Sequence, residues 1–353
     1  MRITSSLATV VVLAAGAHPA LASGAHPALA AGPPSVRFQH HDWELACDNT
    51  RTCRAAGYHA EDGRNAPVTV LLERRAGPGT TIAAHLRLGE RDDGSGTPAS
   101  VAMTVDGRAL GDIGIAAGEG RGALTPVQSA ALLRAVAGAG QVAWHAEGRS
   151  WTLSGKGAAA VLLKMDEFQG RLNTQGAAIR KGAKADSGVP PALPAPVVVA
   201  ARVPATAPPM LNQDDERLLL ATLRKTAGNG DCADLVAVAG GENAFAYAPL
   251  TNGKMLVSAR CWRGAYNEGH GYWIANRRAP FSPVLVTASG TGYDAGTITA
   301  AHRGRGIGDC GGLDEWVWDG RRFVHTASST TGMCRNIAAG GAWALPTLVS
   351  EVR

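Results

Sequence analysis

Long apolar runs are almost absent from this sequence of 353 residues. The one clear run, residues 7–16, is about ten residues long, whereas a helix that spans the membrane core needs about 20. No later stretch is apolar for 18 residues or more. We therefore expect no transmembrane segment once the N-terminal run has been removed.

The sequence also lacks the common signatures of catalysis and cofactor binding. It contains no G-x-S-x-G, H-E-x-x-H, Walker or EF-hand pattern, and its histidines are dispersed. The one G-x-G-x-x-G match, residues 306–311, precedes an expected strand, whereas a dinucleotide site requires a helix there. We expect no catalytic residue and no cofactor, and we favour a protein that is not an enzyme.

No stripe of basic residues runs along the chain, although the net charge is +5. The cationic residues fall in scattered pairs at 74–75, 180–181, 277–278 and 321–322. A nucleic-acid interface usually clusters such residues and places aromatic side chains among them. We therefore expect no nucleic-acid partner.

The first residues follow the order of a secretory signal peptide. A basic residue precedes the apolar run, and residues 20–22 form an A-x-A cleavage site. Residues 16–23 are duplicated in tandem at 24–31, which creates a second, equivalent site. We expect a signal peptide over residues 1–22, with cleavage after 30 as the alternative. Because no cysteine follows either site, we expect a periplasmic protein, or one secreted further, without a lipid anchor.

Two of the six cysteines lie in the first half of the chain and four in the second. In an oxidising compartment an even number in each half indicates disulfides. Pairing within each half allows three of the 15 possible connectivities. A zinc site is the alternative, but C-x5-C is not a zinc-binding spacing, and we expect no metal. The pairs we favour are Cys47 with Cys53, Cys232 with Cys261, and Cys310 with Cys334.

The fold class we expect is α+β, mainly β, with two disulfide-stapled domains. About 320 mature residues exceed the usual size of one core, and the 45 glycines indicate strands joined by turns. We predict a β-sandwich-like domain with two helices over residues 37–181 and a second β-rich domain over 212–353. The segment 182–211 is rich in proline and alanine and predicts a stiff, extended linker.

Several local signals place individual elements. Residues 43–47 alternate as a strand, and Asp-Gly pairs at 106–107 and 319–320 are typical of tight hairpins. Thr125 with Pro126 predicts a helix that runs to Gly138. Ser154 is the expected cap of a helix over about 156–171. Asn212 is the expected cap of a third helix, which has acidic residues in its first turn and cationic residues in its last turn.

One segment of the second domain is a candidate binding site. Glycines crowd residues 304–311, and a hairpin with two tryptophans on one face follows. Such a loop, fixed by Cys310, is preorganised, and tryptophan and arginine are frequent at binding hot spots. The alternative is a structural loop with both tryptophans in the core. The candidate residues are Arg305, Asp309, Trp316 and Trp318.

Five blocks resemble the exported proteobacterial family of domain of unknown function 1176. They are DWELACDNTRTCRAAGY at 42–58, LSGKGAAAVLLKMDEFQGR at 153–171, CWRGAYN at 261–267, RGIGDCG at 305–311 and WVWDGRRF at 316–323. This resemblance implies no activity, because the family has none assigned. The first domain alone is similar, at 106–115 and 153–163, to the invasion associated locus B family. That likeness implies a small secreted β-sandwich linked to host-cell entry.

Three functional classes remain open on sequence grounds. We favour a non-enzymatic binding or interaction protein of the cell envelope, with an unknown envelope component or protein as its partner. One alternative is a hydrolase of envelope polymers, which would need a histidine and a carboxylate or hydroxyl converging in a deep pocket. The other is an inhibitor of lysozyme-like wall hydrolases, because SGTGY at 289–293 resembles a loop of such inhibitors.

Overall fold

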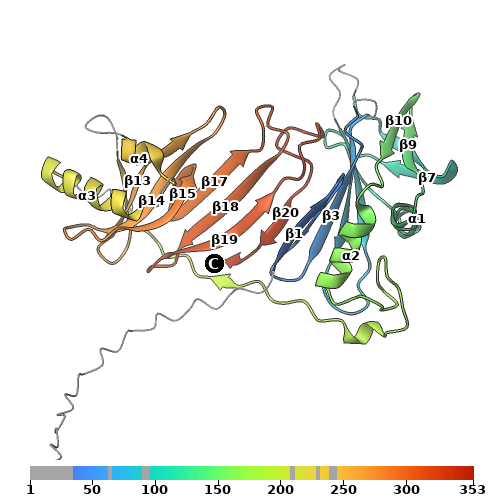
Figure 1. Ribbon diagram of the computed structural model, residues 1–353, viewed down its shortest axis with the longest axis horizontal. Coiled ribbons are helices and arrows are strands. Elements are labelled where there is room, and N and C mark those ends of the chain that lie inside the picture. Colours follow the sequence, from blue (N-terminus) through green and yellow to red (C-terminus); the bar gives the residue numbers. More distant parts are fainter. Residues whose placement is uncertain (1–34, 63–65, 90–95, 207–210, 228–230, 238–244) are drawn as a thin grey trace, which may run out of the picture. The chain divides into compact units, whose positions relative to one another are not determined.

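The computed structural model describes residues 35–62, 66–89, 96–206, 211–227, 231–237 and 245–353. The predicted signal peptide and both predicted cleavage sites lie outside these residues. The described chain is mainly β and has three disulfides, as the sequence predicts, and it contains several antiparallel sheets and four α-helices (Figure 1). No described helix has the length and apolar character needed to cross a membrane.

Two antiparallel sheets make up the first half of the described chain. The six-stranded sheet has the order β1-β2-β3-β4-β5-β8, and the four-stranded sheet the order β10-β9-β6-β7. The strands of the first are β1 (Val36–His40), β2 (Trp43–Cys47), β3 (Cys53–Tyr58), β4 (Val68–Arg74), β5 (Ala83–Leu88) and β8 (Arg121–Ala123). Those of the second are β6 (Ser100–Val105), β7 (Arg108–Gly114), β9 (Val142–Ala146) and β10 (Arg149–Leu153).

The predicted hairpin between β6 and β7 is confirmed. Asp106 and Gly107 both have positive φ, 49° and 76°, which is the requirement of a two-residue turn that follows the twist of its strands. Val105 pairs with Arg108 directly across the turn.

The two helices of the first half have different N-termini. Helix α1 (Pro126–Ala137) begins as predicted, because the Thr125 hydroxyl accepts a hydrogen bond from the Gln128 amide and the Gln128 side chain accepts one from Thr125. The prediction that Ser154 caps α2 (Ala158–Phe168) is wrong. The cap is Gly157 at φ 95°, and a Cβ there would lie 1.9 Å from the His40 carbonyl oxygen. Ser154 instead donates to Asp42.

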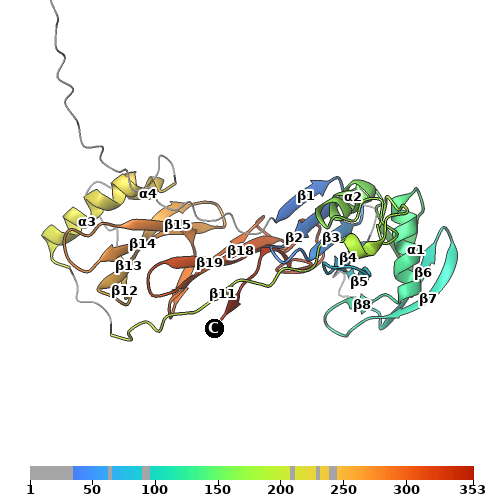
Figure 2. The ribbon, with the colours of Figure 1, turned by 90° about the horizontal axis from the view of Figure 1, so that it is seen from below.

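One apolar core joins both sheets and both helices of the first half. The alternate residues of β2 that the sequence places on one face, Trp43, Leu45 and Cys47, are all fully buried in it. Trp144 and Trp151 enter from the second sheet, and α2 contributes Val161, Leu162 and Met165. The helices therefore pack on the face of the six-stranded sheet that carries the side chains of Trp43, Leu45 and Cys47 (Figure 2).

The other face of the six-stranded sheet is buried too, by a segment from the end of the chain. We call residues 331–345 the C-terminal strap. Its Ile337, Ala342, Trp343 and Leu345 pack on Ala46, Ala56, Tyr58 and Leu71. The Trp343 indole donates to the Thr69 hydroxyl, at 3.0 Å, and Arg335 pairs with Asp42, also at 3.0 Å. No pattern in the sequence predicted this strap.

The second half contains two further antiparallel sheets. The first holds β12 (Ala246–Pro249), β13 (Lys254–Arg263), β14 (Glu268–Asn276) and β15 (Val284–Gly290). The second holds β16 (Gly292–Asp294), β17 (Thr297–Arg303), β18 (Gly311–Trp318), β19 (Phe323–Thr330) and β20 (Leu345–Leu348). The predicted hairpin at 319–320 is confirmed, since Trp318 pairs with Phe323.

Two helices accompany the first of these sheets (Figure 2). Helix α3 (Gln213–Thr226) begins at Asn212, whose side chain accepts a hydrogen bond from the Asp215 amide as predicted. It buries Leu219 and Leu223 beside the disulfide Cys232–Cys261. The short α4 (Ala233–Ala237) was not predicted, because five residues carry too little periodicity to indicate a helix.

The described part of the proline-rich segment is extended, and its backbone has partners. A 3₁₀ turn (Asp186–Gly188) lies near its start, and beyond this turn β11 (Val197–Val198) pairs in parallel with β21 (Glu351–Val352). The Ala201 amide donates to the Trp318 carbonyl, at 2.8 Å. The segment is therefore anchored as well as extended. Residues 33–353 cluster as one unit by contacts, and the predicted domain boundaries stay a prediction.

Candidate functional site

The charged half of the predicted binding site forms a closed network. The Arg305 guanidinium donates twice to the Asp309 carboxylate, at 2.7 and 2.6 Å, and once to the Asn336 side chain, at 2.6 Å. The Asn336 backbone amide donates a third hydrogen bond to the Asp309 carboxylate, and Asp309 is 5% exposed. Burial alone raises the pKa of Asp309, but these hydrogen bonds and the charge of Arg305 hold it below its ordinary value.

The aromatic half of the predicted site is largely buried. Trp318 is fully buried beside Phe323, and its indole donates to the Thr251 hydroxyl at 3.0 Å. Trp316 is partly buried and stacks on His325, with ring centroids 4.8 Å apart.

The two halves do not meet. Asp309 lies just before β18 and Trp318 is its last residue, so a strand of eight residues, roughly 23 Å long, separates them. The structure thus gives the four residues two locations, each with partners inside the chain. Binding by this segment stays a prediction.

One group of possible metal ligands occurs among the described residues, and it belongs to the same loop. Asp309 lies beside Cys310 and Cys334, with ligand atoms within 4.8 Å of one another. Both sulfurs are joined in a disulfide, and the carboxylate already accepts from Arg305 and Asn336. The donors needed for a cation are therefore occupied, because a thiolate, not a disulfide sulfur, binds metal.

Three histidines have polar side-chain partners within the described ranges. His325 lies 3.0 Å from Asp314, His270 lies 3.7 Å from Glu268, and His145 lies 3.1 Å from the Thr104 hydroxyl. None of these pairs lines either of the two hollows described below. They therefore do not supply the converging groups in a deep pocket that a hydrolase needs.

The SGTGY segment at 289–293, which resembles a loop of wall-hydrolase inhibitors, spans the junction between two strands. Its residues end β15 and begin β16, and the Tyr293 ring packs edge-on against Phe323. Inhibition of wall hydrolases stays a prediction.

A cavity with a volume of about 940 Å³ lies beside α1. Its walls are mostly apolar and come from three parts of the chain. Ile82 directly precedes β5. Leu133 and Ala137 belong to α1, and Leu124 lies just before the Thr125 cap of that helix. Ala177, Ala178 and Ile179 follow α2 in the chain. This size falls within the range of sites for small organic ligands, which are also mainly apolar.

A buried ionic network holds one side of this cavity. Asp166 of α2 is fully buried and accepts from the amides of Ala178 and Ile179, at 2.9 and 3.0 Å. It also faces Arg74, at 3.4 Å, whose Nη2 donates to the Gly176 carbonyl. Burial lowers the pKa of Arg74 to about 10, and repulsion from Arg171 adds to the effect, so the guanidinium stays charged at neutral pH. The network fixes residues 176–179 as a wall.

The rim of the cavity carries two cations without partners. Arg134 of α1 and Lys181 both line it and are exposed. Neither makes a hydrogen bond or an ion pair within the described ranges, whereas the one acid at this rim, Asp186, accepts from the Gly176 amide. The rim is therefore suited to an anionic group.

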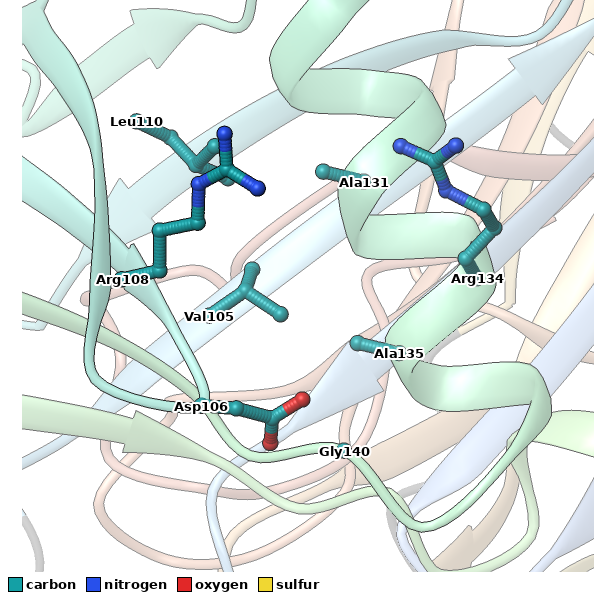
Figure 3. A pocket seen from close by; sticks show the side chains of 8 residues that line it. All are labelled: Val105, Asp106, Arg108, Leu110, Ala131, Arg134, Ala135 and Gly140. Atoms are coloured by element: carbon teal, nitrogen blue, oxygen red, sulfur yellow. The ribbon is translucent and has the colours of Figure 1, made fainter.

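A smaller cleft of about 400 Å³ lies on the other side of α1 (Figure 3). Val105, Leu110, Ala131 and Ala135 form its apolar lining, and Arg134 lines this cleft as well as the large cavity. Figure 3 shows Arg108 of β7 and Arg134 of α1 on facing sides, with both guanidinium groups toward one end and Asp106 at the other.

Sequence reasoning missed both hollows. The cap at Thr125 located α1, but nothing in the sequence indicates that the chain after α2 returns to it. The one signal at this place was the pair Arg180-Lys181, which the sequence offered only as one of four scattered cationic pairs.

Comparisons with known proteins give a family and no activity. The family model "Protein of unknown function (DUF1176)" matches residues 37–350. The chain is 28% identical over 330 residues to the "Uncharacterized protein YpfG" of Escherichia coli strain K12. The aligned region covers 87% of this chain and 90% of that protein. No solved structure matches. The likeness to the invasion associated locus B family is not shown by these comparisons. Because the family model covers nearly all of the described residues, the chain belongs to the family of proteins of unknown function DUF1176.

Proposed function

We propose that this chain is a non-enzymatic binding protein of the bacterial periplasm whose large cavity takes an amphipathic anion. The apolar body of the ligand lies between α1 and residues 176–179, and its charged end lies at Arg134 and Lys181. The observation that carries the proposal is the combination of a mostly apolar hollow of about 940 Å³ with two unpaired cations at its rim.

The periplasmic location rests on the signal-like N-terminus and on the disulfides. All six cysteines are paired, and disulfides form and persist in oxidising compartments. The same proposal includes the division into a domain at 37–181, a linker and a domain at 212–353. Intact mass of the protein from the envelope fraction tests the export step, and retention of Met1 contradicts it.

Isothermal titration calorimetry on the full mature chain tests the cavity. Dodecanoate is the probe and dodecanol the neutral ligand of the same length. We expect dodecanoate to bind more tightly than dodecanol, since only dodecanoate gains from the cations at the rim. Equal affinities, or no heat with either ligand, contradict the proposal.

A bulky substitution locates the binding. Ala130 is an exposed residue of α1 that lines the cavity, so Ala130→Trp fills part of the hollow without disturbing the core. We expect at least a tenfold loss of dodecanoate affinity. The matched control is Ala159→Trp, the same change at an exposed position of α2 that does not line the cavity. A loss in both variants, or in neither, places the ligand elsewhere.

A further inference from the structure

The smaller cleft beside α1 has the features of an anion site. It contains two arginines and one acid, and neither Arg108 nor Arg134 has a hydrogen-bond or ion-pair partner in the part of the chain that the structure describes. Both side chains belong to exposed residues, so they keep their charge without an internal counterion.

The acid in this cleft does not neutralise them. Asp106 sits in the β6–β7 turn, and its carboxylate accepts a hydrogen bond from the Gln141 amide at 2.8 Å. In Figure 3 it lies at the opposite end of the cleft from the two guanidinium groups. The end at Arg108 and Arg134 therefore attracts negative charge.

We infer that this cleft binds a phosphate group carried by the ligand of the large cavity, between Arg108 and Arg134. The inference rests on the proposed function and names the headgroup. Arg134 lines both hollows, so a headgroup that meets Arg134 at the rim of the large cavity can, when it is a phosphate, also engage Arg108 of the cleft. A phosphate ester carries more charge than a carboxylate at neutral pH and offers three acceptor oxygens. Two guanidinium forks can engage these oxygens together.

Three probes separate the headgroup from the tail and from free phosphate. We measure dodecyl phosphate, dodecanoate and inorganic phosphate by calorimetry against the parent chain. We expect dodecyl phosphate to bind at least tenfold more tightly than dodecanoate. Inorganic phosphate should bind weakly and compete with dodecyl phosphate.

Arg108→Gln assigns the effect to the cleft. Because Arg108 does not line the large cavity, this variant should lose the advantage of dodecyl phosphate and keep the parent affinity for dodecanoate. Arg278→Gln is the matched control, the same loss of charge at an exposed arginine outside both hollows, and should change neither affinity. An unchanged thermal unfolding temperature shows that both variants are folded.

The outcomes separate this inference from the proposed function. If dodecanoate binds and dodecyl phosphate has no advantage, or keeps its advantage in Arg108→Gln, the headgroup inference is wrong and the cavity proposal stands. If inorganic phosphate binds at Arg108 but dodecyl phosphate does not exceed dodecanoate, the cleft takes free phosphate and the inference is again overturned. If neither amphiphile binds, the proposed function itself fails.

Discussion

Two arginine-bearing regions of this chain use their charge in opposite ways. In the loop at 305–309, the guanidinium of Arg305 has three hydrogen bonds to Asp309 and Asn336, and the acid is almost fully buried. Around α1, Arg134 and Arg108 flank hollow space and have no internal partner among the described residues.

This contrast shows that residue type alone does not mark a binding site. Glycines, an arginine and an aspartate at 305–309 are typical of a preorganised recognition loop, yet their hydrogen bonds are satisfied within the fold. Cations that remain unpaired beside apolar space are better candidates, because a ligand replaces water there without breaking an existing bond.

The largest effect is expected where paired charges are most deeply buried. Asp166→Ala removes the acceptor of two backbone amides and leaves Arg74 without its nearest counterion. Breaking a buried pair in this way costs about 3–5 kcal/mol. Urea unfolding measures the loss, with Glu167→Ala at the neighbouring exposed position as the control. A loss below about 1 kcal/mol would show that this network is not structural.

Arg305→Ala tests the other side of the comparison. It leaves the buried Asp309 carboxylate with the Asn336 amide as its remaining described donor, and the expected loss is about 1–3 kcal/mol. Arg321→Ala, at an exposed position, should change stability by less than about 0.5 kcal/mol. If Arg305→Ala leaves stability intact but abolishes crosslinking of an envelope partner, the loop is a binding site after all.

Two buried carboxyls should respond to pH in opposite directions. Burial raises the pKa of Glu44 despite hydrogen bonds from Tyr58 and the Met333 amide. The folded chain therefore holds the proton at higher pH than the unfolded chain, and this group's contribution to stability falls as pH rises from about 4.5 through the folded-state pKa. Asp309 behaves in the opposite way, because its pKa is lower in the folded chain. Its contribution to stability is lost as pH falls below the ordinary aspartate pKa of 3.8.

Glu44→Gln isolates the first of these contributions. The amide keeps an acceptor oxygen for Tyr58 and Met333 but does not titrate. We expect unfolding free energy measured in urea from pH 4 to 7 to fall less steeply in this variant than in the parent. An unchanged slope would mean that Glu44 does not titrate differently in the two states.

The smallest effect on stability is expected at the rim of the cavity. Lys181→Gln removes an exposed, unpaired charge, so unfolding free energy should stay within about 0.5 kcal/mol of the parent. Dodecanoate affinity should fall severalfold at low salt, with a smaller difference at high salt, because salt screens exposed charges. A stability loss would place Lys181 among the structural charges instead.

Local signals predicted local structure well. The caps at Thr125 and Asn212, the two Asp-Gly hairpins and the cysteine pairing all depend on residues close in sequence or on the compartment, and all are confirmed. The cap at Ser154 failed because a cap residue must also fit its surroundings. The His40 carbonyl leaves room only for glycine at the start of α2.

Long-range features could not be predicted in this way. The cavity needs Ile82, Leu133 and Ile179 side by side, and no period or spacing in one sequence relates them. The alternation of β2 likewise indicated one buried face. Ala46 and Ala56 on the other face carry no signal that distant residues cover them.

The strap also sets the order in which the fold can be completed. Its hydrogen bond from Met333 to Glu44 joins residues 289 positions apart. Contacts between such distant residues form slowly, because a long loop must close before they contribute. Until residues 331–345 have been synthesised, the apolar patch of Ala46, Ala56, Tyr58 and Leu71 lacks the cover that they provide. A nascent or truncated chain therefore presents this patch to solvent, and it is the surface at which a folding helper or an aggregation contact would first act.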